Sequence, residues 1–194
     1  YTRYKARDGL ELPAYVTLPP GRPAKNLPLV IMPHGGPYDV RDEGTYDAEV
    51  QFLANRGYAV LQPQYRGSGG YGEAFDKQGQ GQWGRAMQDD LDDGMDWLAK
   101  EGTIDPTRVC IIGSSYGGYA AMWGAIRNPE RYRCAASFAG ISDLKRQLKY
   151  QIANHLLNSK ADSQRQSERI KHLNIQQNEA SPHFWRTTQQ QEID

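Results

Sequence analysis

The chain has 194 residues, about the length of one domain and enough to bury a core. Its 23 basic and 23 acidic residues balance, so composition gives no reason to expect nucleic acid or an anionic membrane as a partner. No apolar run approaches the roughly 18 residues of a membrane span. Because the chain begins at Tyr1 rather than Met, we expect an excised piece of a longer parent. The sequence leaves open whether that parent is located in the cytoplasm, or in the periplasm or outside the cell.

Short apolar or alternating runs predict six strands, at residues 2–7, 11–18, 29–32, 58–61, 107–112 and 133–138. The first two form a hairpin around the turn pair Asp8-Gly9. Apolar residues at helical spacing predict helices between the later strands, at residues 46–56, 82–100 and 119–126. This alternation predicts an α/β fold with a mainly parallel sheet, helices on both faces and an N-terminal hairpin.

The composition changes beyond Gly140, where the chain becomes rich in Gln, Asn, Ser and charge. Helical fragments are expected only around 144–157 and 164–173. We therefore interpret residues 1–142 as the sheet core and residues 143–194 as a polar helical tail. Together we expect them to form one partial domain, 1–194.

The residues Gly113-Ser114-Ser115-Tyr116-Gly117 spell G-x-S-x-G between a predicted strand and a predicted helix. This is the setting of a nucleophile elbow, which holds a serine exposed at a sharp turn. Ser115 is therefore the candidate nucleophile. In an α/β-hydrolase the N–H after the nucleophile, here that of Tyr116, stabilises the oxyanion together with a glycine-rich loop. The run His34-Gly35-Gly36-Pro37, after an earlier strand, matches that loop.

The sequence resembles the prolyl oligopeptidase family of serine peptidases, and most of all its acylaminoacyl- and dipeptidyl-peptidase-like members. The matching segments follow the family's order over about three quarters of the chain: 8–15, 27–37, 52–72, 82–91, 108–121 and 132–144. The resemblance implies Ser115 as nucleophile, an oxyanion held by the backbone N–H groups of Gly36 and Tyr116, a Ser-Asp-His triad and short peptides as substrates. We expect no cofactor and no metal.

The chain departs from the family after the elbow. The family's H-G-x-x-D and later G-H contexts are absent, so the catalytic Asp and His are not found in this chain. His155, His172 and His183 all lie in polar surroundings. We expect truncation before the last strands of the sheet, although a divergent chain with its base elsewhere is the alternative. The parent is expected to carry the family's N-terminal β-propeller.

Three functions follow from these residues. The first is a serine exopeptidase or oligopeptidase that forms an acyl-enzyme on Ser115. The second is a carboxylesterase of the same fold, and the third is a catalytically silent fragment that only binds or assembles. Since a truncated parallel sheet exposes an edge, we also expect the fragment to self-associate.

Other residues receive structural interpretations. His34 is expected to be structural or to line a pocket, and Arg66 to position loops near the active site. The loop 65–72 lacks the Gly-Lys-Ser/Thr ending of a phosphate-binding loop and is interpreted as structural. Three tryptophans are interpreted as packing residues: Trp83, Trp97 and Trp123. Five carboxylates on one predicted helix are interpreted as a solvated acidic face: Asp89, Asp90, Asp92, Asp93 and Asp96.

The two cysteines, Cys110 and Cys134, lie in apolar strand-like runs. We expect both to be buried free thiols. A disulfide between them is the alternative if the two strands are neighbours.

Overall fold

A computed structural model describes residues 1–158 of the chain, with side chains through residue 154. The chain divides into two units, Tyr1–Ser142 and Asp143–Asp194. In the second unit the described part is one helix, α5 (Leu144–Asn158). The predicted helical fragment at 164–173 lies outside the described residues. Among the helices of the described part, none is both long and apolar enough to cross a membrane.

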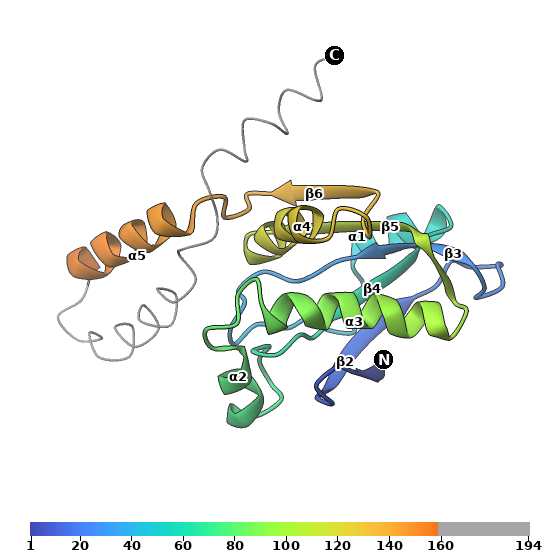
Figure 1. Ribbon diagram of the computed structural model, residues 1–194, viewed down its shortest axis with the longest axis horizontal. Coiled ribbons are helices and arrows are strands. Elements are labelled where there is room, and N and C mark those ends of the chain that lie inside the picture. Colours follow the sequence, from blue (N-terminus) through green and yellow to red (C-terminus); the bar gives the residue numbers. More distant parts are fainter. Residues whose placement is uncertain (159–194) are drawn as a thin grey trace, which may run out of the picture. The chain divides into compact units, whose positions relative to one another are not determined.

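The first unit is built on a six-stranded sheet in the order β1-β2-β4-β3-β5-β6 (Figure 1). The strands are β1 (Thr2–Lys5), β2 (Glu11–Thr17), β3 (Leu27–Ile31), β4 (Ala59–Pro63), β5 (Ile104–Ser114) and β6 (Cys134–Phe138). The hairpin strands β1 and β2 are antiparallel, and β2 runs antiparallel to β4. The remaining neighbours, in the sheet order β4-β3-β5-β6, are all parallel, as the sequence predicts.

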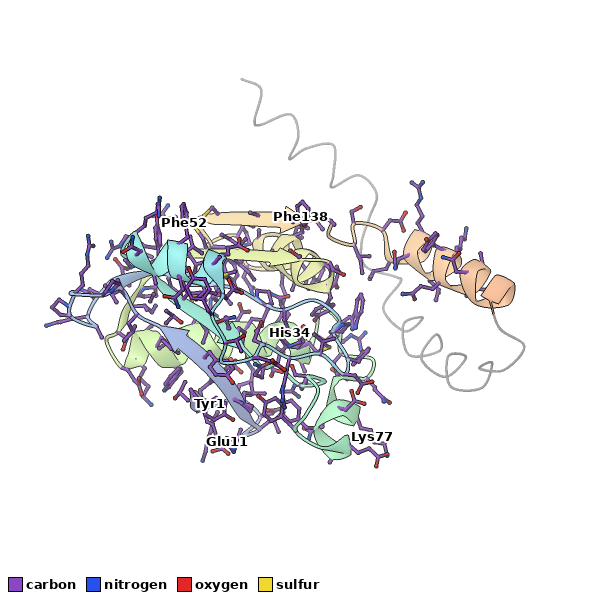
Figure 2. The ribbon with its side chains drawn as sticks, turned by 180° about the vertical axis from the view of Figure 1, so that it is seen from behind. Tyr1, Glu11, His34, Phe52, Lys77 and Phe138 are labelled. Carbon is purple, nitrogen blue, oxygen red and sulfur yellow. A yellow bond between two sulfur atoms is a disulfide. The ribbon has the colours of Figure 1, made fainter. Side chains whose placement is uncertain are left out.

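Helices cover both faces of this sheet, as predicted. They are α1 (Ala48–Asn55), α3 (Ala86–Lys100) and α4 (Tyr116–Arg127), and a further short helix, α2 (Glu73–Gly79), follows the loop after β4. Figure 1 shows α3 and α4 in front of the sheet and α1 behind it, and the reverse view in Figure 2 agrees. Helix α2 was not predicted, because its seven residues include a single buried aromatic, Phe75, and therefore show no periodicity.

The core lies where the three central parallel strands meet these helices. The apolar residues of these strands that are fully buried include Leu29, Ile31, Leu61, Val109 and Ile111. Strands buried on both faces are expected to read as continuous apolar runs, which explains why the sequence locates them well. Because β3, β4 and β5 are parallel neighbours, the loops after their carboxyl ends meet at one edge of the sheet.

The acidic residues of α3 contradict the predicted solvated face. Asp90, Asp92 and Asp93 are buried, whereas Asp96 is exposed. Each buried carboxylate has a donor: Arg66 for Asp90, Tyr132 and Asn128 for Asp92, and Arg7 for Asp93. The helix therefore uses these carboxylates to tie loops and strands to itself, since a buried carboxylate needs a partner.

The prediction of two buried free thiols was wrong. Cys110 of β5 and Cys134 of β6 form a disulfide, and their Cα atoms are 4.7 Å apart. The two residues are register partners on adjacent parallel strands, which places their side chains within bonding reach. Cys134 is also exposed, as are the other four residues of β6.

Candidate active site

Ser115 lies in the turn between β5 and α4, where the elbow motif predicts it. Its backbone has φ 56° and ψ −119°, a left-handed conformation that is strained for a residue with a side chain. The residue is exposed. Its backbone N–H donates to the Phe138 carbonyl at 3.0 Å, and its carbonyl accepts from the Tyr119 N–H at 3.0 Å. The turn therefore presents the hydroxyl outward while its backbone is fixed from both sides.

The glycines of the motif are required by close contacts. A Cβ atom on Gly113 would collide with the backbone of Gly117, and one on Gly117 would collide with the Pro33 carbonyl. A Cβ on Gly118 would lie 2.8 Å from the Gly140 Cα atom. The G-x-S-x-G spacing thus allows strand, turn and helix to approach more closely than side chains would permit.

The His34-Gly35-Gly36 loop packs directly against the elbow. A Cβ built on Gly35 would lie 3.4 Å from the Ser114 carbonyl oxygen and 3.5 Å from the Ser115 Cβ. The contact arises because the loop follows β3 and the elbow follows β5, and these strands are parallel neighbours. The structure therefore brings together the elbow and the loop that holds Gly36, the two parts from which an oxyanion hole would be built.

His34 is buried beside this loop rather than exposed to solvent. Figure 2 shows it within the body of the first unit, whereas Phe138 lies at the outer edge on β6. Its ring stacks on Tyr65 with 4.3 Å between centroids. Burial lowers the pKa of His34 to about 4, although the contact with the Gly35 carbonyl opposes this shift. The ring is therefore neutral at pH 7, which fits the predicted structural role.

Arg66 anchors the loop that follows β4. Its backbone N–H and guanidinium both donate to the Asp90 carboxylate, with contacts between 2.7 and 3.1 Å. The guanidinium also donates to the Asp8 carboxylate at 2.8 Å. These contacts join the hairpin turn, the β4 loop and α3, so Arg66 fixes the position of the loop, as the sequence suggests.

The three tryptophans pack as predicted. Trp83 is buried and lies edge-on to Tyr116, with 4.7 Å between ring centroids. Trp97 stacks on Tyr4 at 5.7 Å, and the indole N–H of Trp123 donates to the Gly84 carbonyl at 2.9 Å.

Among residues 1–154, whose side chains the structure describes, none hydrogen-bonds to the Ser115 Oγ as a catalytic base would. The His155 side chain, His172 and His183 lie outside the described part of the chain. In the same described part, no group of three His, Cys, Asp or Glu side chains is arranged to hold a metal ion. The arrangement therefore brings together an exposed serine on a strand–helix turn and a glycine loop packed against it.

Sequence reasoning missed two buried residues at this site, Tyr65 and Ser68, both of which contact His34. The available signal was the position of Tyr65-Arg66-Gly67-Ser68 directly after β4. Since β4 is the parallel neighbour of β3, residues after these two strands are expected to meet at the same edge.

Comparisons with known proteins match most of the chain. A family model described as the prolyl oligopeptidase family matches residues 44–187. The chain is 42% identical over 146 residues to dipeptidyl aminopeptidase BIII of Pseudoxanthomonas mexicana, which covers 72% of this chain and 21% of that protein. It is 31% identical over 133 residues to the acylamino-acid-releasing enzyme of Homo sapiens, covering 66% of this chain and 18% of that protein.

Two solved structures share the backbone arrangement. A puromycin hydrolase matches with a TM-score of 0.70 at 30% identity, covering 76% of this chain and 23% of that one. The acylaminoacyl peptidase of Pyrococcus horikoshii matches with a TM-score of 0.69 at 29% identity, covering 77% and 24%. The chain thus spans less than a quarter of the length of each of these four proteins.

Proposed function

Because this chain belongs to the prolyl oligopeptidase family of serine peptidases and has the α/β-hydrolase fold, we propose that Ser115 is the nucleophile of a serine peptidase. The proposal concerns the natural protein that carries this chain, since the relatives are more than four times as long as the matched region. The proposed substrates are short peptides, which agrees with the dipeptidyl- and acylaminoacyl-peptidase names of the relatives.

In the proposed reaction the Ser115 Oγ attacks the carbonyl carbon of a peptide bond and loses its proton to a base. The backbone N–H groups of Gly36 and Tyr116 stabilise the oxyanion that forms. The amine then leaves with a proton, and an acyl-enzyme remains on Ser115. Water hydrolyses that ester and restores the serine.

One observation carries this proposal: an exposed serine held at φ 56° on a strand–helix turn, with the glycine loop packed against it. Backbone strain of this kind is retained where the surrounding structure enforces it, and it is concentrated at functional sites. Here the close glycine contacts supply that enforcement.

The proposed base and its orienting acid are not identified in this chain. Triad members act as a unit, and losing one of them removes most of the rate enhancement. We therefore expect the 194 residues alone to hydrolyse peptides far more slowly than the natural protein that carries them. In isolation the chain then corresponds to the silent fragment.

A covalent probe tests the nucleophile. The natural protein is treated with a fluorophosphonate, and the modified residue is located by mass spectrometry. We expect labelling at Ser115 and none in Ser115→Ala. Ser114→Ala is the matched control, since it removes the neighbouring hydroxyl of the same motif and should keep the label. Labelling at another residue, or no labelling of the wild type, contradicts the proposal.

A second experiment separates a peptidase from an esterase. It compares the rates at which the natural protein hydrolyses aminoacyl-p-nitroanilides and p-nitrophenyl esters.

A further inference from the structure

The disulfide between Cys110 and Cys134 lies on the face of the sheet that α4 does not cover. Successive residues of a strand point to opposite faces. Ser137 of β6 points toward α4, because a Cβ on Gly118 would lie 2.7 Å from the Ser137 Oγ. Cys134, three residues earlier, therefore points to the other face. Helix α1 covers that face over β2 and β4, and Cys134 is exposed.

The two sulfur atoms of this bond differ in access. The row of register partners across the sheet is Val30 of β3, Cys110 of β5 and Cys134 of β6. A thiolate attacks a disulfide sulfur from the side opposite the sulfur that leaves. For Cys110 that side faces Val30, which is 2% exposed. For Cys134 it faces the outer edge of the sheet, where the described residues place no further strand. Access therefore favours attack at Cys134.

β6 also holds the turn that carries Ser115. Its register with β5 runs from Cys110 with Cys134 to Ser114 with Phe138, and the Ser115 N–H then donates to the Phe138 carbonyl at 3.0 Å. All five residues of β6 are exposed, so the hydrogen bonds of this strand open more readily than those of the buried strands. The disulfide links β5 and β6 covalently at the end of the ladder that is far from the turn.

We propose that the disulfide between Cys110 and Cys134 is a thiol-exchange site, attacked at Cys134, and that its state controls how firmly β6 holds the Ser115 turn. The reactant is a soluble thiol of the glutathione type. Exposed disulfides are generally the exchangeable ones, whereas shielded disulfides resist soluble thiols. The exchange does not depend on what Ser115 does, but its effect on the rate at Ser115 rests on the proposed function.

The exchange takes place in two balanced steps. A thiolate attacks the Cys134 Sγ and the S–S bond breaks. Cys110 leaves as a thiolate and takes up the proton that the reacting thiol lost, so Cys134 carries a mixed disulfide. A second thiolate then attacks the reactant's sulfur in that mixed disulfide and releases Cys134, which is protonated in the same way. The protein disulfide has gained two electrons, and two thiol molecules have been oxidised to one disulfide.

The first test locates the exchange in the 194-residue chain in dilute solution. The chain is incubated briefly with reduced glutathione, free thiols are blocked by alkylation, and the products are mapped by mass spectrometry. We expect the glutathionyl group on Cys134 and the alkyl group on Cys110. Two single variants make a matched pair. Cys110→Ser leaves Cys134 free, and Cys134→Ser leaves Cys110 free. The first variant should react with oxidised glutathione at least about tenfold faster than the second.

The second test measures how firmly β6 is held, by hydrogen exchange of the same chain. Reduction should speed exchange of the amides of β6 and of Ser115 about tenfold or more. The reason is that the link between two residues separated by 24 positions no longer restrains the strand. β1, the other outer strand of the sheet, is the internal control, and its exchange should not change. Reoxidation should restore slow exchange in β6.

The third test measures the rate in the natural protein. Thiol treatment should slow acylation of Ser115 by the fluorophosphonate about tenfold, because a loosened turn holds the hydroxyl less precisely. Reoxidation should restore the rate. The double variant Cys110→Ala with Cys134→Ala should react at the slow rate with or without thiol, which separates this disulfide from any other cysteine. Melting temperatures show whether each variant is folded.

Each outcome decides the proposal. A glutathionyl group on Cys110, or a disulfide that glutathione leaves intact, overturns the exchange site. Exchange that rises equally in β1 and β6, or in neither, overturns the hold on the turn. So does a thiol that leaves the wild-type acylation rate unchanged, or that slows the double variant as much as the wild type. If the wild type is not labelled at Ser115, the proposed function fails, and the two experiments on the 194-residue chain still decide the exchange site and the hold.

Discussion

At the scale of single residues, His34 shows how burial at the site couples to stability. Its pKa is lowered to about 4 from an ordinary value of 6.5, and burial is the larger cause. Between these two values the unfolded chain binds more protons than the folded chain at this residue. The stabilising contribution of the neutral ring is therefore complete above pH 6.5 and is lost as pH falls through 4.

This residue gives a prediction with a defined sign. The shift from 6.5 to about 4 corresponds to about 3 kcal/mol of unfolding free energy lost between pH 7 and pH 4. Urea unfolding at both pH values should show that loss in the wild type and not in His34→Gln, which has no ring to protonate. The raised pKa values of Asp42 and Asp90, both about 6, act in the opposite direction. They are present in both chains and cancel in the comparison. Equal pH slopes in the two proteins contradict the prediction.

At the scale of elements, α3 is an anchor as well as a cover for the sheet. Its periodic residues Met87, Leu91 and Met95 pack on the sheet, as their spacing predicts. Its carboxylates are buried because donors arrive from the hairpin turn, the β4 loop and the segment before β6. The helix thereby holds in place the loop that carries Tyr65 and Ser68.

Two aspartates of this helix make a matched pair. Asp90→Ala should lower the unfolding free energy by about 3–5 kcal/mol, because it leaves the buried Arg66 guanidinium without its main carboxylate. Asp96→Ala should change it by about 1 kcal/mol or less, since its ion pair with Arg131 is exposed. Urea denaturation of both variants at pH 7 measures the difference. Similar losses in the two variants would restore the interpretation of a solvated acidic face.

The sequence predicts those parts of the fold and site whose signals are local. Ser115 and the His34-Gly35-Gly36 loop were found because their motifs are short and sit at strand ends. The strands β3 to β5 were found because their burial produces apolar runs. The burial of Asp90 was not found, because its partner Arg66 is 24 residues away and approaches only through the folded β4 loop.

Strand pairing explains two further differences. The disulfide depends on Cys110 and Cys134 being register partners, which is decided by sheet order rather than by either local run. Likewise, Tyr65 and Ser68 reach His34 only because β4 lies next to β3. In each case the missing information is a neighbour relation between segments distant in sequence.

At the scale of the whole sheet, its two outer strands differ in character. β1 carries the exposed charges of Arg3 and Lys5, and Arg3 pairs with Glu11 of β2. Charged side chains on an outer strand oppose pairing with another chain. β6 reads Cys-Ala-Ala-Ser-Phe, has no charge and is exposed along its whole length. Among the described strands it has one neighbour, β5.

This contrast predicts that the 194-residue chain self-associates through β6. The free backbone groups of an uncharged outer strand pair readily with a second copy, and the Phe138 side chain, 78% exposed, adds apolar area to the contact. Sedimentation velocity over a range of concentrations should show species larger than the monomer. Ala136→Lys places a charge in the middle of β6 and should shift the chain toward monomer. The control Ala24→Lys adds the same charge in the loop before β3 and should leave the association unchanged. A wild-type chain that stays monomeric at all concentrations, or equal association in both variants, excludes β6 as the contact.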